Sequence, residues 1–150
     1  MRIHHSQRFH VVPAVYVIFR DGDKVLLLKR ANTGYRDGEY SMPSGHVDGG
    51  EPAVVAAARE AKEEVGVTID PTDLKLVHTQ HRLAEEGDHE RISLYFEATK
   101  WQGEPVNAEP HKCSGLLWAD MAALPKNLVP ELQEFLRHWE RGSNYGHFGF

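Results

Sequence analysis

The sequence contains a single cysteine, no long apolar run and no excess of positive charge. One cysteine, Cys113, excludes an internal disulfide and fits a protein of a reducing compartment. No apolar stretch approaches the roughly 20 residues that a membrane-spanning helix needs. The formal net charge of −5 gives no support to general attraction to nucleic acid or to an anionic membrane. An acidic protein that handles an anionic substrate must therefore reverse the sign of charge locally.

Repeats, low-complexity segments and linker-like stretches are also missing from the chain. Its 150 residues fit one domain, and a domain of this size buries about 68–70% of its unfolded surface on folding. The segment MRIHHSQRFH lacks the apolar stretch of a secretory signal. We therefore expect one domain over residues 1–150, in the cytoplasm and without membrane attachment.

Apolar segments and turn signals predict a mixed α and β chain. Val11–Phe19 and Lys24–Lys29 are rich in β-branched, aliphatic or aromatic residues, and the Arg-Asp-Gly-Asp turn between them predicts a hairpin. A helix is expected from about Pro52 to Val65, with Gly66 as its stop. Further strands are expected over 74–83, 91–99 and 115–120, and a last helix over about 129–141, followed by a loosely ordered tail at 142–150.

The segment REAKEEVG crowds negative charge onto one side of the first predicted helix. Glu60, Glu63 and Glu64 fall within an arc of about 100°. Like charges at these i,i+3 and i,i+4 spacings each cost roughly 0.2–0.5 kcal/mol. The opposite side is apolar and is expected to pack on the core with Val54, Ala58, Ala61 and Val65.

A solvated charged face is the ordinary explanation of such a strip, but two features favour a binding site. The glutamates lack lysine partners at the favourable i,i+4 spacing. A glycine-rich loop, Gly45–Gly50, leads into the helix N-terminus, where free N–H groups and the helix dipole attract anions. An anion-binding loop beside hard oxygen ligands suits a phosphate that is bridged to Mg²⁺.

Residues 45–67 resemble the Nudix box, whose pattern is G-x5-E-x7-R-E-U-x-E-E-x-G-U, with U a large aliphatic residue. Every fixed polar and glycine position matches. Ala61 departs from the pattern because a bulkier aliphatic residue is usual there, and Met-Pro-Ser-Gly at 42–45 stands where Pro-Gly-Gly is common. The resemblance implies a Nudix-type α/β/α sandwich with a mixed central sheet, in a single domain.

The resemblance also implies an activity, namely hydrolysis of a nucleoside diphosphate linked to another moiety, assisted by Mg²⁺ or Mn²⁺. Metal ions neutralise the charge of a phosphoanhydride, lower the pKa of a bound water and hold the group for in-line displacement. Glu60, Glu63 and Glu64 match the metal-binding glutamates of the family. Ser44 would offer its backbone carbonyl to the same cation.

Catalytic and structural roles are implied at further positions of the box. Glu63 and Glu64 are expected to be catalytic as well as metal-binding. Arg59 matches an arginine that orients a carboxylate, and Glu51 matches the loop glutamate that pairs with it. Gly45 is expected to shape the backbone beside the substrate.

Three positions outside the box resemble the mutator-type branch, which acts on oxidised guanine nucleotides. Residues 101–112 resemble a loop that supplies an additional carboxylate, and the alignment points to Glu109, with Glu104 as competitor or both as solvated loop residues. Arg30 matches a substrate-phosphate contact, or is simply a strand-end arginine. Asn127 matches a base-reading asparagine, or is a helix N-cap.

Signatures of other branches of the family narrow the substrate. Those of the ADP-ribose, dinucleoside polyphosphate and coenzyme A branches are absent or incomplete, which favours a nucleoside triphosphate, oxidised or otherwise modified forms included. Nucleotide sugars and dinucleoside polyphosphates remain alternatives. We expect a small-molecule nucleotide partner, no stable binding of nucleic acid, and a monomer or homodimer.

Other classes of function have weaker patterns. An isomerase of isoprenoid diphosphates needs a cysteine in its own motif, and Cys113 lies in another context. A non-catalytic Nudix-fold domain usually loses box glutamates, whereas this chain keeps them. Zinc binding by His78, His81 and His89 lacks a complete tetrahedral set. A thiol nucleophile at Cys113 beside His111 lacks a third orienting group.

Overall fold

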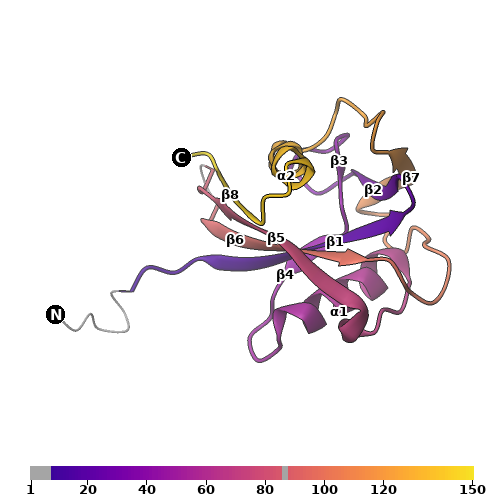
Figure 1. The fold of residues 1–150 in the computed structure, drawn as a ribbon, viewed down its shortest axis with the longest axis horizontal. Coiled ribbons are helices and arrows are strands. Elements are labelled where there is room, and N and C mark those ends of the chain that lie inside the picture. The colour runs from indigo at the N-terminus through magenta and orange to yellow at the C-terminus, as the bar shows by residue number, and fades with distance from the viewer. Residues whose placement is uncertain (1–7, 86–87) are drawn as a thin grey trace.

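A computed structural model describes residues 8–85 and 88–150 (Figure 1). The elements in chain order are β1 (Val12–Asp21), β2 (Lys24–Arg30), β3 (Tyr40–Ser41), β4 (Ser44–His46), α1 (Ala53–Val65), the 3-10 turn η2 (Pro71–Asp73), β5 (Leu74–Arg82), β6 (Arg91–Ala98), β7 (Cys113–Asp120), α2 (Pro130–Glu140) and β8 (Tyr145–Phe148). Neither described helix is long and apolar enough to cross a membrane. The expected hairpin, strands and helices are present; β3, β4 and β8 were not anticipated.

The strands form one mixed sheet, in the order β3-β2-β1-β6-β5-β8, with β4 paired to β1 and β7 paired to β2. Strand β1 is central because it pairs antiparallel with both β2 and β4 and parallel with β6. Helices α1 and α2 lie on opposite sides of this sheet (Figure 1). The architecture confirms the predicted single-domain α/β/α sandwich with a mixed sheet.

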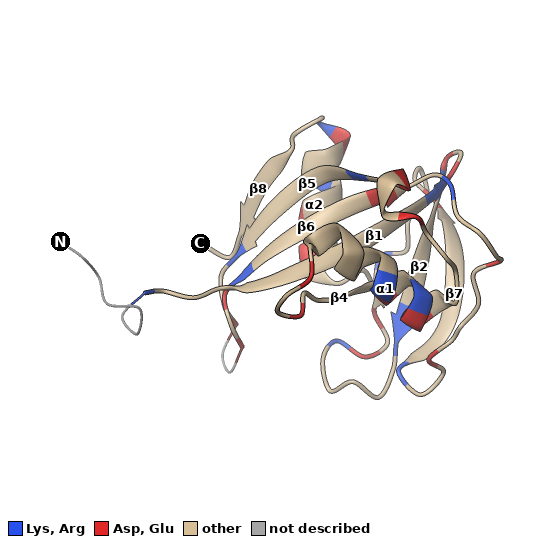
Figure 2. Ribbon diagram, turned by 90° about the horizontal axis from the view of Figure 1, so that it is seen from below, with Lys and Arg blue, Asp and Glu red and all other residues tan. Residues whose placement is uncertain are grey.

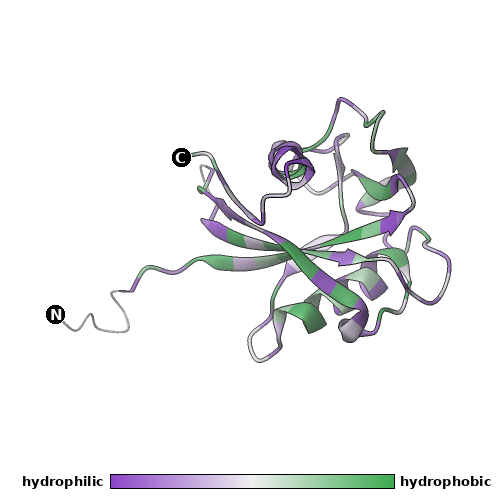
Figure 3. Cartoon of the chain, in the orientation of Figure 1, coloured by the Kyte–Doolittle hydropathy of each residue, from purple (hydrophilic) through white to green (hydrophobic). Residues whose placement is uncertain are grey.

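Two apolar clusters fill the two sides of the sheet. Successive side chains of a strand point to opposite faces, so β1 supplies residues to both clusters. Figure 3 shows the hydrophobic stretches of the central strands between the two helices. The α1 side receives Val15, Val17 and Phe19, and the α2 side receives Ala14, Tyr16 and Ile18. The sheet is therefore anchored from both faces, which fixes the position of β4 beside β1.

Helix α1 has the predicted ends, and its buried face is wider than predicted. Gly66 follows it in the left-handed conformation (φ 72°), and its N–H donates to the carbonyl of Lys62 at 3.1 Å. The buried residues are Ala56, Ala57, Ala61 and Val65. Val54 packs against the core as expected, although it is only partly buried, and Ala58 is partly buried as well. The difference arises because β4 covers the side of α1 that begins at Ala56.

The tail 142–150 is not loosely ordered, in contrast to the expectation. Tyr145–Phe148 form β8, which pairs parallel with β5. The ring N–H at Nδ1 of buried His78 donates to the carbonyl of Ser143 at 2.9 Å. Gly146 lies against the ring of His138, where a Cβ would have no room. The strand is short and its partner is distant in sequence, so local patterns gave no signal for it.

We expect removal of residues 143–150 to lower the free energy of unfolding. His78 would lose its hydrogen-bond partner, and an unsatisfied buried polar group costs about 1–3 kcal/mol. Urea unfolding of the shortened and full chains measures the difference. Removal of Gly149 and Phe150 alone is the control, because it leaves β8 intact. Equal midpoints for the full chain and the chain ending at Gly142 would show that the tail does not stabilise the fold.

Candidate active site

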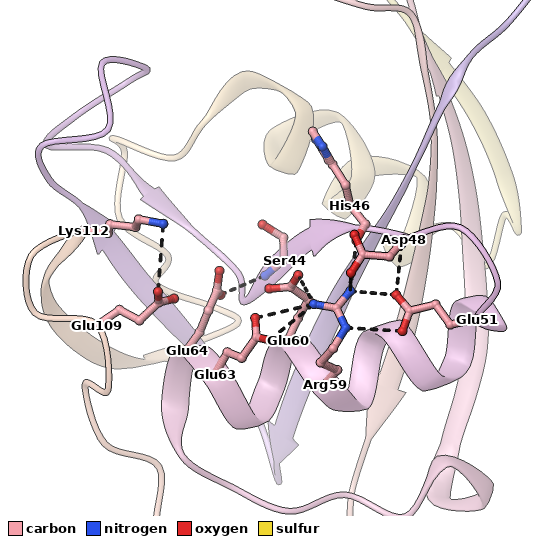
Figure 4. Close-up of polar contacts among 10 residues, drawn as sticks. All are labelled: Ser44, His46, Asp48, Glu51, Arg59, Glu60, Glu63, Glu64, Glu109 and Lys112. Carbon is pink, nitrogen blue, oxygen red and sulfur yellow. Dashed lines mark hydrogen bonds and ion pairs between the residues drawn. The ribbon is translucent and has the colours of Figure 1, made fainter.

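The box helix and two loops enclose a cleft of about 590 Å³. Strand β4, helix α1 and the ends of β2 and β7 contribute its walls, and Figure 4 shows its polar side chains. The acidic members are Asp48, Glu60, Glu63, Glu64 and Glu109, and the basic members are Lys29, Arg30, His46 and Lys112. The structure thus brings Glu109 together with the predicted metal-binding glutamates of α1, although the two segments are distant in the chain.

Arg59 is the hub of an ion-pair network on one side of this cleft. Its guanidinium donates to both oxygens of Glu51, at 2.7 and 3.3 Å, which is the pairing that the sequence predicts. It also contacts Glu60 at 3.0 Å, Glu63 at 3.4 Å and Asp48 at 3.4 Å. These contacts, that with Glu51 above all, raise the pKa of Arg59 and keep it charged. Figure 2 shows the same mixture of charge along α1.

Glu64 lies on the inner side of α1 and is partly buried. One carboxylate oxygen accepts a hydrogen bond from the backbone N–H of Ser44 at 3.0 Å. Burial raises the pKa of Glu64 to about 8, and the nearby charges of Glu60 and Glu109 act in the same direction. Strand β4 causes this burial of Glu64, because it covers the acidic side of α1.

The absence of a side chain at Gly45 allows this close approach. A Cβ atom at Gly45 would overlap the carboxylate of Glu60. Burial and the charge of Glu63 raise the pKa of Glu60, although the contact with Arg59 opposes them. The lack of a side chain at Gly45 therefore leaves space for a carboxylate beneath β4, and its predicted contact with substrate stays a prediction.

The donor set fits a hard divalent cation, but the side chains are not yet arranged around one. Carboxylate oxygens are the ligands that Mg²⁺ prefers, and a cation would relieve the repulsion that raises the pKa values of Glu60 and Glu64. Among residues 8–85 and 88–150, no three His, Cys, Asp or Glu side chains form a ready metal cage. Arg59 holds Glu60 and Glu63 instead. A cation at this place would share Glu60 and Glu63 with Arg59, because each carboxylate has two oxygens that can accept.

The loop before β7 carries Glu109 into the cleft. The backbone N–H of Ala108 donates to the carbonyl of Glu64 at 3.1 Å, which ties the loop to the last turn of α1. Glu109 faces the box glutamates from the other side, with Lys112 4.0 Å away (Figure 4). Glu104 is exposed and does not line this cleft. The geometry favours Glu109 over Glu104, and its catalytic role stays a prediction.

Arg30 and Asn127, the two predicted substrate contacts, have different surroundings. Arg30 lines the cleft, where its guanidinium donates to the carbonyl of Tyr35 at 2.7 Å and to the hydroxyl of Thr33 at 3.1 Å. The side-chain amide of Asn127 donates to the carbonyl of Gly38 at 2.9 Å. Asn127 lies outside both clefts of the described chain and does not cap α2. Its observed contact orders the loop between β2 and β3.

A second cleft of about 460 Å³ adjoins the first, and the sequence gave little sign of it. The two clefts share five residues, namely Arg30, Ser41, Ser44, Gly45 and His46. The second also contains Tyr35 and Arg91, together with Glu131 from the first turn of α2. Glu131 is on the buried face of α2 with Phe135. In the sequence, a carboxylate within this apolar row was the one available sign of the second cleft.

Zinc binding by histidines and a thiol nucleophile at Cys113 gain no support from the described residues. His81 pairs with Glu90 at 2.7 Å, and buried His78 bonds to a backbone carbonyl. Cys113 is buried, and its thiol donates to the carbonyl of Gly115 at 3.2 Å. His81, Cys113 and the Nδ1 of His78 therefore each have an ordinary local partner, whereas the Nε2 of His78 is buried without one among the described residues.

Known proteins resemble this chain in sequence and in fold. The NUDIX domain family matches residues 9–139. The 8-oxo-dGTP diphosphatase of Escherichia coli (strain K12) is 30% identical over 97 residues, 64% of this chain and 71% of that protein. The NAD-capped RNA hydrolase NudC of Stutzerimonas stutzeri is 29% identical over 129 residues, 84% of this chain but 42% of that protein.

Solved structures show the same fold at lower sequence identity. The MutT NUDIX hydrolase from Burkholderia pseudomallei has a TM-score of 0.77 and 24% identity, over 84% of this chain and 95% of that one. The MutT protein from Bacillus halodurans has a TM-score of 0.71 and 24% identity, over 91% and 88%.

The fold is an α/β/α sandwich with one acidic cleft built on its first helix, and the family match covers most of the chain. The chain belongs to the Nudix family. It is a Nudix-type hydrolase, which confirms the type of enzyme that residues 45–67 predict.

The raised pKa of Glu64 predicts a dependence of stability on pH. Its pKa is about 8 in the folded protein against an ordinary value of 4.5. The folded state therefore keeps a proton that the unfolded state releases, so the contribution of Glu64 to stability falls as pH rises from about 4.5 to about 8. We expect Glu64→Gln to gain stability relative to wild type over this range, by on the order of 1 kcal/mol or more.

Urea unfolding in the presence of a chelator, from pH 5 to 8.5, measures this difference. Glutamine retains an acceptor for the N–H of Ser44, so the hydrogen bond at 3.0 Å can persist. Glu104→Gln, at an exposed position, is the control and should keep a constant offset from wild type. A constant offset for Glu64→Gln as well would contradict the raised pKa.

Proposed function

We propose that the protein hydrolyses a phosphoanhydride bond in a nucleoside diphosphate linked to another moiety, with Mg²⁺ as cofactor and Mn²⁺ able to substitute. The observation that carries this proposal is the convergence of Glu60, Glu64 and Glu109 in one cleft whose other wall is basic. Carboxylates without a cation repel a phosphate, whereas carboxylates that hold a cation attract it.

Each polar group of the cleft then has a defined task. Glu60, Glu63 and Glu64 would hold the cation, with the carbonyl of Ser44 as a neutral oxygen ligand. When bound, the cation would supply neutralisation of phosphate charge and Lewis acidity. Arg59, fixed by Glu51, orients the carboxylates before the cation arrives.

Substrate binding and proton transfer fall to the opposite side of the cleft. Arg30 and Lys112 bind phosphate oxygens, since both line this wall and carry positive charge. Glu109 accepts the proton of the attacking water, because it faces the box glutamates without being part of α1. A carboxylate that already binds a cation is a poor proton acceptor, so a separate base is needed.

For the substrate we favour a nucleoside triphosphate, cleaved to the monophosphate and diphosphate. Similarity to an 8-oxo-dGTP diphosphatase over 71% of that protein supports this choice. The resemblance to NAD-capped RNA hydrolases covers less than half of those chains, and it carries less weight. A screen of nucleotides with Mg²⁺ or Mn²⁺, followed by phosphate release with an added pyrophosphatase or phosphatase, tests the activity.

We predict that Glu64→Gln lowers kcat by at least about 10²-fold, because it removes a charge that holds the cation. We also predict that millimolar Mg²⁺ or Mn²⁺ raises the melting temperature of wild type, since the cation binds only the folded protein. Steady-state hydrolysis and thermal unfolding measure the two effects. Near wild-type turnover in Glu64→Gln, or a melting temperature that is indifferent to both metals, would contradict the site.

We predict that Glu109→Gln lowers kcat by roughly 10–10³-fold while the stabilisation by metal changes little. The reason is that proton transfer needs substrate, whereas the box glutamates bind the cation without it. Glu104→Gln is the matched control, because Glu104 is in the same loop but outside the cleft. If Glu104→Gln is the slower variant, or neither variant is slow, the base lies elsewhere.

A further inference from the structure

Asn107 is in the loop that carries Glu109, and both ends of its side-chain amide make hydrogen bonds. Its amide nitrogen donates to the carbonyl of Cys113 at 2.7 Å. Its amide oxygen accepts from the backbone N–H of Glu109 at 3.3 Å. One half-buried side chain therefore contacts both the residue that we propose as the base and the first residue of β7.

Two turns meet at Glu109. The contact from the Asn107 side chain to the N–H two residues later is an Asx-turn. The carbonyl of Glu109 in turn accepts from the N–H groups of Lys112, at 2.9 Å, and Cys113, at 3.1 Å. Pro110 follows Glu109, where its fixed φ favours such a turn. The backbone of Glu109 is thus hydrogen-bonded on both sides, and only the bond to its N–H depends on another residue's side chain.

The rest of the loop is held by backbone groups and does not need Asn107. The N–H of Ala108 donates to the carbonyl of Glu64 at 3.1 Å, at the end of α1. The N–H of Ala31, after β2, donates to the carbonyl of Lys112 at 2.9 Å. These bonds can form whatever the side chain at position 107, so the course of the loop is set without it.

The contacts of position 107 suit an asparagine. Its short side chain carries an acceptor oxygen and an NH₂ donor, and both are used here. Aspartate would place a carboxylate against the carbonyl of Cys113. Serine can accept from the N–H two residues later, but more weakly, and it has only one polar atom for two partners. The residue type thus matches a side chain that closes residues 107–113 at two points.

Glu109 depends on its backbone for direction, because its carboxylate has little else to hold it. Among the described residues its one ion pair is with Lys112, at 4.0 Å, and that lysine side chain is 60% exposed. A long contact with an exposed lysine fixes a carboxylate weakly. Figure 4 shows Glu109 facing the box helix from the opposite side of the cleft. A base has to be placed closely, since a shift of about 1 Å can cost 10²-fold in rate.

We propose that Asn107 is a positioning residue that fixes the direction of Glu109 into the cleft. In this role it acts through Glu109 alone. This inference rests on the proposed function, because it takes Glu109 as the acceptor of the proton from the attacking water.

Asn107→Ala removes both hydrogen bonds and should lower kcat by about tenfold, with KM within about twofold of wild type. The stabilisation by millimolar Mg²⁺ should not change, because the box glutamates are untouched. Gln102→Ala is the matched control, since Gln102 is exposed in the same loop and its backbone, rather than its side chain, bonds to Thr68. Wild-type kcat in Asn107→Ala, or a change in KM alone, would overturn the proposal.

A double-mutant cycle separates positioning from a general loosening of the loop. If Asn107 acts through Glu109, then adding Asn107→Ala to Glu109→Gln should change kcat by less than about twofold. Losses that multiply would show that Asn107 acts independently of Glu109 and would overturn the proposal.

Asn107→Ser is the second variant in case Asn107→Ala does not fold. Its hydroxyl can keep a weaker form of the bond to the N–H of Glu109 but loses the bond to Cys113. We expect a kcat about threefold below wild type, with the same lack of additivity on the Glu109→Gln background. Wild-type kcat in Asn107→Ser, or losses that multiply, would count against the role of Asn107 in the same way.

Amide hydrogen exchange of the protein without nucleotide separates this inference from the proposed function. Asn107→Ala should speed exchange at the Glu109 amide by at least about tenfold, because that N–H loses its acceptor. The Ala108 amide, bonded to the carbonyl of Glu64, should exchange at the wild-type rate. Equal exchange at Glu109 in the two proteins would refute the inference, whatever the nucleotide screen gives. Absence of hydrolysis by wild type on every nucleotide would instead refute the proposed function.

Discussion

Glu60, Glu63 and Glu64 repel one another on a single face of α1, and the ion pairs of Arg59 offset that repulsion in the folded protein. Arg59 can do so because Glu51 fixes its guanidinium through two hydrogen bonds. The arrangement of the acidic side chains in the cleft depends on the balance between this repulsion and these ion pairs. In the proposed site, a cation would share two of the carboxylates with this guanidinium.

Strand β4 turns this helix surface into a cleft. It is short and pairs with the central strand β1, whose side chains are anchored in both apolar clusters. The rigid sheet therefore holds β4 directly over the glutamates, and only a glycine at position 45 leaves room for the Glu60 carboxylate. Burial under β4 raises the pKa of Glu64, which links a feature of the sheet to the protonation of a candidate metal ligand.

Local sequence patterns determined the box helix, its glycine stop, the hairpin and the acidic side of α1, because these depend on residues a few positions apart. The pairing of Arg59 with Glu51 was predictable for the same reason. Short strands such as β8 were not, since four residues carry little periodic signal and their partner is far along the chain. The buried face of α1 is also wider than predicted, because β4 covers a side that periodicity alone leaves exposed.

By itself the sequence determined the family, the fold class and the residues that could hold a cation, because spaced acidic and glycine positions are local and specific. Only the tertiary structure decided how those residues are used. It buried Glu64, brought Glu109 against it, and directed Asn127 to the carbonyl of Gly38. It also joined Tyr35, Arg82 and Glu131 from a loop, a strand and a helix. Contacts between such distant segments follow from the packing of the sheet and α2, which no local pattern encodes.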